Sequence, residues 1–392
     1  MVKPGAVEFA PNFRNPEVHQ AVVAIEQLLP GHIELTASAM LSLGRRLPVS
    51  IDTNINTDLS GDVSSGIITY SVKDTTGRIK SPQITIPKFY ASWPGSAGIC
   101  PYYSPPSGDV LLGRLCPDYQ QITQIMSRAN STYEAAIVSL ARYGRRGLSF
   151  HAHYTYAHAM DWNPQEVTLG AGSSALAPLD SKQDSDQEYG TSNLDVRHSA
   201  AVMTVLESPW KLHDVAGRLA NGWMLSAIGQ FHSGLPYSMR ITGSIPARPE
   251  TGPYPQFFGL GPSMNGSGGD NRIYGTGSDG VSYNFGRNSF RYPNTWKADL
   301  RLAKRFDLGE MRQLEVLVES FNLFNHQNVT ELETTGYYIE NSSASENPTL
   351  NLLTEGTTGS AATTPAFGQP LNINATDFYR ERQIEIGVRM RF

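Results

Sequence analysis

The chain has 392 residues, of which 17% are charged, and its formal net charge at pH 7 is -5. This slightly acidic balance excludes the basic surface that nucleic-acid binding requires, so we expect no nucleic-acid partner. No run approaches the ~18 to 20 apolar residues of a membrane-spanning helix, and the 36 glycines, 25 prolines and 18 tyrosines favour a β-rich chain with many turns.

Alternation of apolar and polar residues predicts long β-strands along the whole chain. In chain order, the segments with this pattern are 18–29, 32–41, 131–143, 148–158, 197–206, 222–238, 296–306, 313–320 and 383–392. In the last of them, Ile384, Ile386 and Val388 fall on one face, while Glu385 and Arg389 fall on the other. We expect about ten long strands and an all-β, antiparallel fold.

The connections between these strands alternate between short and long. Short turns follow Leu29, Tyr143 and Phe306. The long connections are residues 44–119, 160–194, 240–293 and 325–376. This asymmetry is typical of an outer-membrane β-barrel, which has short periplasmic turns and long extracellular loops. We therefore predict that residues 1–392 form one portion of a transmembrane β-barrel, with an incomplete or open sheet.

The first long loop contains two further features. Apolar runs on both sides of the turn at 74–78 predict a small hairpin outside the membrane. The only two cysteines, Cys100 and Cys116, follow in a stretch rich in proline and glycine. The sequence allows either a disulfide between them or two free thiols, because sequence spacing does not define the geometry of a disulfide.

Charged residues occupy the polar face of the last three predicted strands. Adjacent strands carry opposite charges there, so we expect a salt-bridged inner wall that hydrates and stiffens the lumen. A path for a substrate is the alternative. The expected lumen-facing charges are Lys297, Asp299, Arg301, Glu315, Glu319 and Arg389, with Arg305, Glu385 and Arg391 beside them.

Other candidate sites favour simpler explanations. The glycines of GTGSDG at 275–280 match a dinucleotide-binding motif, but no strand and helix flank them as that motif requires. His151 and His153 share a strand face, but two ligands do not make a metal site. No motif of a nucleophilic or metal-dependent enzyme occurs. We expect no catalytic residue, cofactor or metal, and no enzymatic activity.

Aromatic residues lie where a membrane–water interface would cross the strands. Trp223, Trp296 and Phe392 are near predicted strand ends, and Tyr154 and Tyr156 are on an apolar row. Aromatic rings prefer the headgroup level, so we interpret them as an aromatic girdle. Platforms on which sugars stack are the alternative.

Several segments together resemble one family, the TonB-dependent receptors of the Oar-like group. They include PNFRNPEVHQ, the stretch from NSTYEAAIVSL to YTYAHAMD, LDVRH, and WKADLRLAKRF with VESFNLFNHQNV. The carboxyl terminus also resembles the signal by which outer-membrane barrels are recognised for assembly. Glu385, Gly387, Met390 and Phe392 occupy its positions.

The resemblance implies the C-terminal part of a plugged barrel that imports a bulky nutrient, such as a chelate or an oligosaccharide. The signal peptide, TonB box and plug of such receptors are absent from these residues, so we expect a fragment that does not transport alone. The implied partners are outer-membrane lipid, the barrel-assembly machinery, the missing N-terminal barrel and plug portion, and TonB. A non-transporting surface or adhesion protein is the alternative; a soluble all-β hydrolase or lectin is a third possibility.

Overall fold

The computed structural model of the chain describes residues 6–53, 67–87, 122–144, 147–162, 189–210, 212–213, 215–242, 274–285, 288–309, 312–340, 349–354, 365–375 and 380–392. Nearly all regular elements in these ranges are β-strands, and the one helix is the six-residue α1 (Val215–Ala220). No helix in this part of the chain has the length and apolar character needed to cross a membrane.

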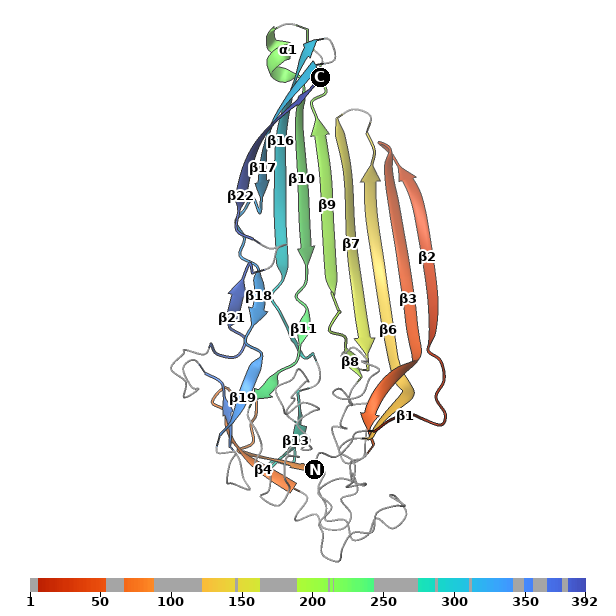
Figure 1. The fold of residues 1–392 in the computed structure, drawn as a ribbon, viewed down its shortest axis with the longest axis vertical. Coiled ribbons are helices and arrows are strands. Elements are labelled where there is room, and N and C mark those ends of the chain that lie inside the picture. Colours follow the sequence, from red (N-terminus) through yellow and green to blue (C-terminus); the bar gives the residue numbers. More distant parts are fainter. Residues whose placement is uncertain are drawn as a thin grey trace, which may run out of the picture.

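One sheet of long strands dominates the structure (Figure 1). Its nine long strands lie side by side in chain order, and each pair of neighbours is antiparallel. They are β2 (Glu17–Leu29), β3 (Ile33–Asp52), β6 (Ile122–Arg142), β7 (Leu148–Asp161), β9 (His198–Glu207), β10 (Trp223–His232), β16 (Thr295–Gly309), β17 (Arg312–Phe321) and β22 (Gln383–Arg391).

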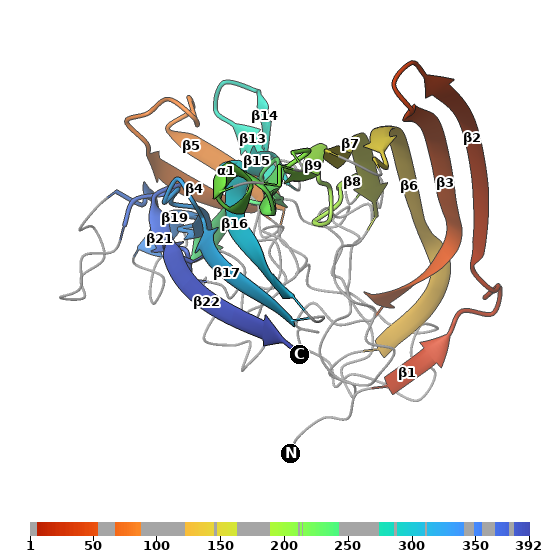
Figure 2. The ribbon, with the colours of Figure 1, turned by 90° about the horizontal axis from the view of Figure 1, so that it is seen from above.

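Two short strands complete this sheet. β1 (Ala6–Phe9) pairs with β6 in parallel, and β8 (Gly190–Thr191) pairs with β7. Among the described residues, β2 and β22 do not pair with each other, so the sheet curves without closing (Figure 2). The predicted all-β fold with an open sheet of antiparallel strands is confirmed. The residues that the structure describes contain nine long strands, close to the expected number of about ten.

The register of the sheet separates two faces. Leu225, Leu302, Val318 and Ile386 stand opposite one another across β10, β16, β17 and β22, and all four are at least 36% exposed. We call this apolar side the outer face. The inner face is the opposite side, where Arg301 stands opposite Glu319. Side chains alternate between the two faces along each strand. The observed register of strand pairing therefore places the apolar rows of neighbouring strands on the same face.

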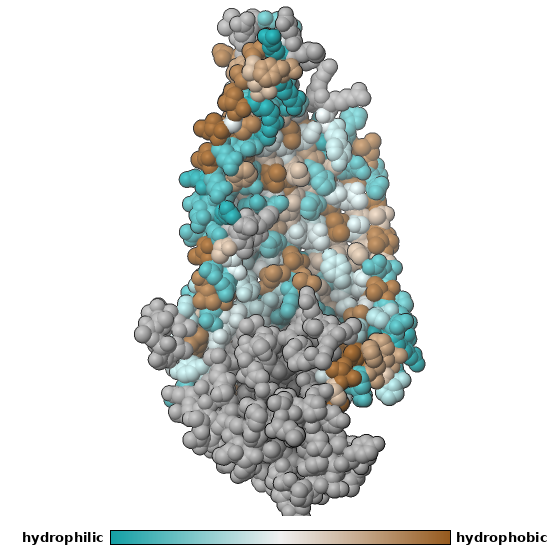
Figure 3. Space-filling model, in the orientation of Figure 1, coloured by the Kyte–Doolittle hydropathy of each residue, from teal (hydrophilic) through white to brown (hydrophobic). Residues whose placement is uncertain are grey.

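Figure 3 shows one face of the molecule, on which hydrophilic, intermediate and hydrophobic residues are mixed along the long strands. On the outer face the apolar residues of four neighbouring strands form continuous exposed rows. Such a surface is unfavourable in water. The outer face therefore requires an apolar environment.

The two ends of the long strands differ. Short connections and the carboxyl terminus lie at one end, which we call the short-turn end, and the long connections lie at the other, the loop end (Figure 1). β3 extends to Asp52, into the range predicted as the first long loop, and β6 begins at Ile122, before the strand predicted at 131–143. A register shift between Gly44 and Leu47, where Arg46 has a φ of 56°, interrupts the alternation and hides this extension from the sequence pattern.

The predicted long loops contain a second sheet at the loop end. It has seven strands, in the order β12-β19-β20-β4-β5-β13-β14. The strands are β4 (Ile67–Lys73), β5 (Gln83–Pro87), β12 (Arg240–Thr242), β13 (Tyr274–Gly277), β14 (Ser282–Asn284), β19 (Thr335–Glu340) and β20 (Thr349–Leu352). The predicted hairpin around 74–78 is confirmed by the antiparallel pairing of β4 and β5. The glycine motif at 275–280 lies in the β13–β14 hairpin.

This second sheet has its own hydrophobic core. Tyr70, Ile84, Met239, Tyr337 and Leu350 are each at most 1% exposed and pack together. Two short strand pairs belong to neither sheet. They are β11 (Pro236–Tyr237) with β15 (Phe290–Arg291) and β18 (Val329–Leu332) with β21 (Pro370–Ile373). The core brings together three segments that are far apart in the chain, around 70–84, 239 and 337–352, so local sequence patterns do not predict it.

The facing of β22 leads to a test. We expect Ile386→Arg to impair insertion into a membrane far more than Glu385→Arg, because an arginine on a lipid-facing strand costs roughly 2 to 4 kcal/mol at the bilayer midplane. Glu385 stands opposite Glu319 on the inner face, where an arginine would meet a carboxylate. Heat-modifiable gel mobility of the complete protein measures insertion. Equal losses in both variants would contradict the facing.

Candidate functional site

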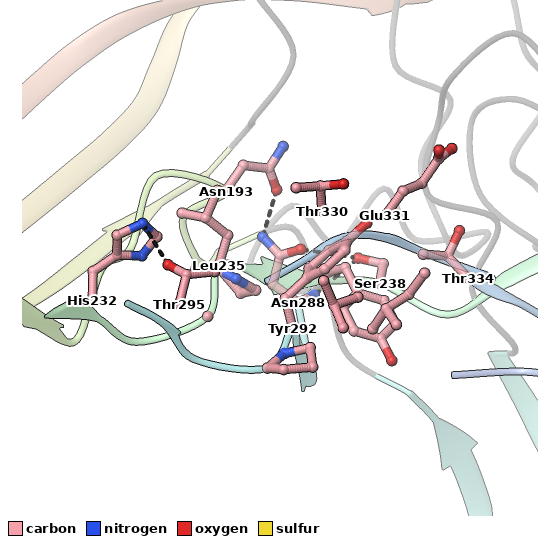
Figure 4. Close-up of a pocket in the computed structure, with 16 residues that line it drawn as sticks. Asn193, His232, Leu235, Ser238, Asn288, Tyr292, Thr295, Thr330, Glu331 and Thr334 are labelled. Carbon is pink, nitrogen blue, oxygen red and sulfur yellow. Dashed lines mark hydrogen bonds between the residues drawn. The ribbon is translucent and has the colours of Figure 1, made fainter. Parts of the chain in front are cut away.

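A cavity of about 550 Å³ opens over the inner face at the loop end. We call it the loop-end cavity. Figure 4 shows His232 and Thr295 on one side of it and Glu331 and Thr334 on the other. Its lining comes from connections that are distant in sequence and includes Asn193, Tyr237, Ser238, Asn288, Tyr292 and Thr330.

A sharp bend after β10 forms one wall of the cavity. His232 ends β10, and its Nε2 lies 2.8 Å from the Thr295 hydroxyl on β16. Two residues later the chain passes so close to Tyr292 that a Cβ on Gly234 would lie 1.6 Å from the Tyr292 carbonyl oxygen. Only glycine fits there. The Leu235 carbonyl accepts a hydrogen bond from the Tyr292 N–H at 2.9 Å, which fixes the two segments together.

Asn288 connects three of the cavity's segments. Its side-chain amide donates to the Thr191 carbonyl at 2.7 Å and to the Asn193 Oδ1 at 2.6 Å. Its backbone N–H donates to the Ser238 hydroxyl at 2.9 Å. The residue is only 6% exposed and has a φ of 57°, a conformation that asparagine tolerates better than most residues. Its buried polar atoms are thus satisfied by the segments they join.

Asp195 fixes the segments beside this cavity. Its side chain is wholly buried and forms ion pairs with Arg291 and, at 3.3 Å, with Arg197. It also accepts a hydrogen bond of 2.6 Å from the Ala159 N–H on β7. Arg291 donates further to the carbonyls of Asp195 and Gly234. These contacts tie the LDVRH segment to β7 and to the wall of the cavity.

The charge of Asp195 is stabilised where it lies. Burial alone would raise the pKa of its carboxyl. The Ala159 N–H and the two guanidinium groups outweigh burial, so the pKa of Asp195 is lowered from its ordinary value. The carboxylate is therefore ionised at neutral pH, and it holds both arginines in place.

The cavity can bind a polar, largely uncharged ligand with flat apolar surfaces. Tyr237 forms an aromatic cluster with Phe290 at 5.7 Å and Tyr292 at 5.1 Å between ring centroids. Amide and hydroxyl groups supply donors and acceptors around the rings. Among the described lining residues Glu331 is an acid and none is a lysine or arginine, so nothing there selects for an anion.

A second cavity of about 470 Å³ lies on the inner face nearer the short-turn end, over β10, β16, β17 and β22. Glu315 is central to it. Its carboxylate contacts Arg305 at 2.8 Å, Arg301 at 2.9 Å and Arg389 at 3.9 Å. Arg301 also reaches Glu319 at 3.2 Å. These contacts join opposite charges on neighbouring strands, and a position of these side chains in a lumen stays a prediction.

Lys297 and Asp299 are placed differently from the other predicted charges. They pair with each other along β16, at 3.4 Å, rather than across strands. Asp299 also accepts a hydrogen bond of 2.8 Å from the Asn322 N–H just beyond β17. These two side chains therefore stabilise the end of the β16–β17 pair, while the group around Glu315 crosses three strands.

The residues of the predicted assembly signal lie on β22, at the edge of the sheet. Glu385 stands opposite Glu319, so this cross-strand pair has two carboxylates. Met390 stands opposite Leu314. A Cβ on Gly387 would lie 3.0 Å from Leu317 Cδ1, so glycine makes room for that leucine. Phe392 follows the strand and is 88% exposed. Recognition of these residues by an assembly machinery stays a prediction.

The predicted girdle residues lie toward both ends of the outer face. Trp223 begins β10 at the short-turn end. Trp296 lies at the loop end of β16 and stacks on His326 with 4.2 Å between ring centroids. Tyr154 and Tyr156 are 43% and 46% exposed on β7. A position at the two membrane interfaces is compatible with this placement.

The remaining candidates form no site in the described part of the chain. The rings of His151 and His153 are 5.8 Å apart, and no group of three or more metal-ligating side chains occurs among the residues that the structure describes. Cys100 and Cys116 lie outside the described residues. Sequence reasoning missed Asn288, Asp195 and Tyr237 as parts of a site, although LDVRH was noted as a motif.

The comparison with family models agrees with the geometry. The model of a family described as outer membrane beta barrel domain matches residues 2–384. Among solved structures, the chain is similar to the outer membrane transporter YddB from Escherichia coli, with 5% identity and a TM-score of 0.39. That similarity covers 88% of this chain and 32% of the transporter, so the chain spans about a third of its length. The search of curated proteins gives no match.

The Asp195 corner gives a prediction. We expect Asp195→Asn to destabilise the protein by about 1–3 kcal/mol, because a buried ionic acceptor is lost and two arginines lose their partner. This loss of stability is measured as a lower temperature at which the folded band disappears in heat-modifiable gels. Since the folded-state pKa is lowered, the stabilisation exists above the ordinary aspartate pKa and is lost as the pH falls through the folded-state value. The difference should therefore shrink as the pH falls below roughly 4 and vanish only below the lowered folded-state pKa.

The matched control is Asp307→Asn, which changes an exposed aspartate on β16. It should leave the transition temperature nearly unchanged. A similar loss in both variants, or a difference for Asp195→Asn that persists in strong acid, would contradict the role assigned to Asp195.

Proposed function

We propose that this chain, which belongs to the outer membrane beta barrel domain family and is located in the outer membrane, is the barrel portion of a TonB-dependent receptor of the Oar-like group. It takes part in the uptake of a bulky nutrient, an oligosaccharide or a metal chelate. It performs no catalysis. The observation that carries the proposal is the loop-end cavity, because it lies where a ligand would first meet a barrel whose long connections face outward.

The position and lining of the cavity support binding from the loop end. At about 550 Å³ it falls in the size range of small-molecule sites. Its polar groups come from segments held by Asn288 and Asp195, so the site is fixed before a ligand arrives. Such fixed sites bind with a smaller loss of conformational entropy. The lining favours an oligosaccharide over an anionic chelate.

The charged inner wall supports a hydrated lumen between the loop-end cavity and the short-turn end. Glu315, at 12% side-chain exposure, is compensated by three arginines rather than left for a substrate. We therefore assign the charges of β16, β17 and β22 mainly to stiffening of the wall. A polar lumen is typical of barrels of this kind.

The open edges of the sheet support a larger assembly. β2 and β22 end the described sheet, and unpaired backbone groups in hydrocarbon cost several kcal/mol each. We propose that further strands of the complete receptor pair with these edges, that a plug fills the lumen, and that TonB supplies energy for uptake. The barrel-assembly machinery would insert the protein through the strand that ends at Phe392.

A non-transporting surface or adhesion protein is the second candidate. The seven-stranded sheet favours it, because this sheet forms a separate, well-packed unit at the loop end. A unit of this kind would suit contact with another macromolecule. The aromatic residues of the loop-end cavity favour uptake instead.

Uptake by the complete receptor distinguishes the two. We expect the receptor to support uptake of at least one member of a panel of labelled oligosaccharides and ferric chelates. Tyr237→Ala should raise the concentration for half-maximal uptake roughly two- to tenfold, because an aromatic contact contributes about 0.5–1.5 kcal/mol. Tyr143→Ala, at a residue 77% exposed at the short-turn end, is the control and should have no effect.

The alternative has its own readout in the same strains. Loss of cell–cell or cell–surface adhesion on deletion of the receptor, with no uptake of any panel member, would overturn the transport proposal. Uptake that is equally sensitive to both tyrosine variants would remove the loop-end cavity from the mechanism.

A further inference from the structure

The connection between β9 and β10, residues 208–222, is longer than the other connections at the short-turn end and contains α1. Hydrogen bonds among its described residues hold the connection together. The Asn221 side chain donates to the Leu212 carbonyl at 2.7 Å and accepts from the Leu212 N–H at 3.1 Å. The Ser208 hydroxyl donates to the Ala220 carbonyl at 3.0 Å. A Cβ on Gly217 would lie 2.1 Å from the Leu212 oxygen, so the segment is tightly folded on itself.

Large apolar side chains point outward from the same connection. Trp210 is 59% exposed, Leu212 is 47% exposed and Leu219 is 71% exposed. A loop in water would have the opposite arrangement, with polar side chains outside and apolar ones packed within. Figure 3 shows hydrophobic residues on the surface at this end of the molecule. The connection therefore fits an apolar surrounding.

Lys304 fastens the connection to the outer face of the sheet. On β16 it has the same facing as Leu302 and stands opposite Val316, so its ammonium group would otherwise lie on an apolar row. It is only 6% exposed. Its Nζ donates to the Leu219 carbonyl at 3.1 Å and to the Asn221 carbonyl, at the carboxyl end of α1, where a cation is favourable.

Aromatic rings complete the cover of this lysine. Its Nζ lies 5.3 Å from the ring centroid of Trp223 and 5.2 Å from that of Phe306. The Trp223 indole N–H donates to the same Leu219 carbonyl at 2.7 Å. The lysine charge is thereby compensated by carbonyls and rings. Among the hydrogen bonds and ion pairs of the described residues, none joins Lys304 to a carboxylate.

We infer that the described part of the β9–β10 connection forms an interfacial anchor, in which Trp210, Leu212 and Leu219 enter the boundary between headgroups and acyl chains of the leaflet at the short-turn end. The occupant is lipid, because the connection continues the outer face: Trp223 and Leu225 of β10 lie directly beside it and are 40% and 36% exposed. Lys304 holds the anchor against the barrel wall. Membrane-interface segments commonly combine tryptophan and leucine in this way.

Spin-label accessibility in the complete receptor tests the inference. The receptor, with Cys100 and Cys116 changed to serine, is reconstituted in vesicles of phosphatidylethanolamine and phosphatidylglycerol. A nitroxide on Leu219→Cys should be relaxed severalfold more by oxygen, which concentrates in lipid, than by a water-soluble nickel chelate. A nitroxide on Arg312→Cys is the control. Arg312 is exposed at the start of β17 at the same end, and its label should be relaxed mainly by the nickel chelate.

Two results would overturn the inference. A label at Leu219 that responds to nickel as the control does lies in water. A label that neither reagent reaches is covered by protein, and the occupant is then another part of the receptor or a partner.

A second variant tests the role of Lys304 separately. Lys304→Met keeps a long side chain and should leave the heat-modifiable folded band intact. The label at Leu219 should become more mobile, and its relaxation by nickel should rise about threefold. An intact barrel with an unchanged label signal would show that Lys304 does not hold the anchor.

Discussion

The structure depends on one constraint: in hydrocarbon, each backbone N–H and C=O group needs a hydrogen-bond partner within the protein. Nine long antiparallel strands meet it by pairing in chain order, without a crossover. This continuous register then determines the facing of each side chain, because a shift of one residue would exchange the two faces. The apolar outer face, the charged inner face and the unpaired edges at β2 and β22 all follow from it.

Charge is arranged according to the same two faces. On the inner face Glu315 meets arginines from its own neighbours on both sides, so the charges are compensated across three strands. On the outer face the structure covers a lysine instead of exposing it. Lys304 is enclosed by α1 and two aromatic rings. A buried charge needs such partners, since its desolvation is otherwise unfavourable.

At the loop end the constraint changes, because water is available and the chain is free to leave the barrel register. Segments distant in sequence assemble there into a seven-stranded sheet with a core around Tyr70 and Tyr337. Asn288 and the ion pairs of Asp195 join this region to the long strands. The rigidity of the loop-end cavity comes from these few buried polar contacts.

The sequence by itself determined the features that depend on local alternation. It located the nine long strands, the apolar face of β22, the charged residues of β16 and β17, and the β4–β5 hairpin. In a strand each side chain points to one of only two faces, and successive side chains alternate between them. These features can therefore be predicted without knowledge of distant contacts. The pattern failed where it was broken, as at the bulge near Arg46, which hid the extension of β3.

Only the tertiary structure decided which distant segments meet. The Asp195–Arg291 pair, the contact of Gly234 with Tyr292, and the cover of Lys304 by α1 each join residues separated by more than fifty positions. Nothing in the local pattern of either partner specifies the other, because the attraction arises only after the sheet has brought them together. The loop-end cavity and the membrane-facing connection therefore became visible in the fold and not in the sequence.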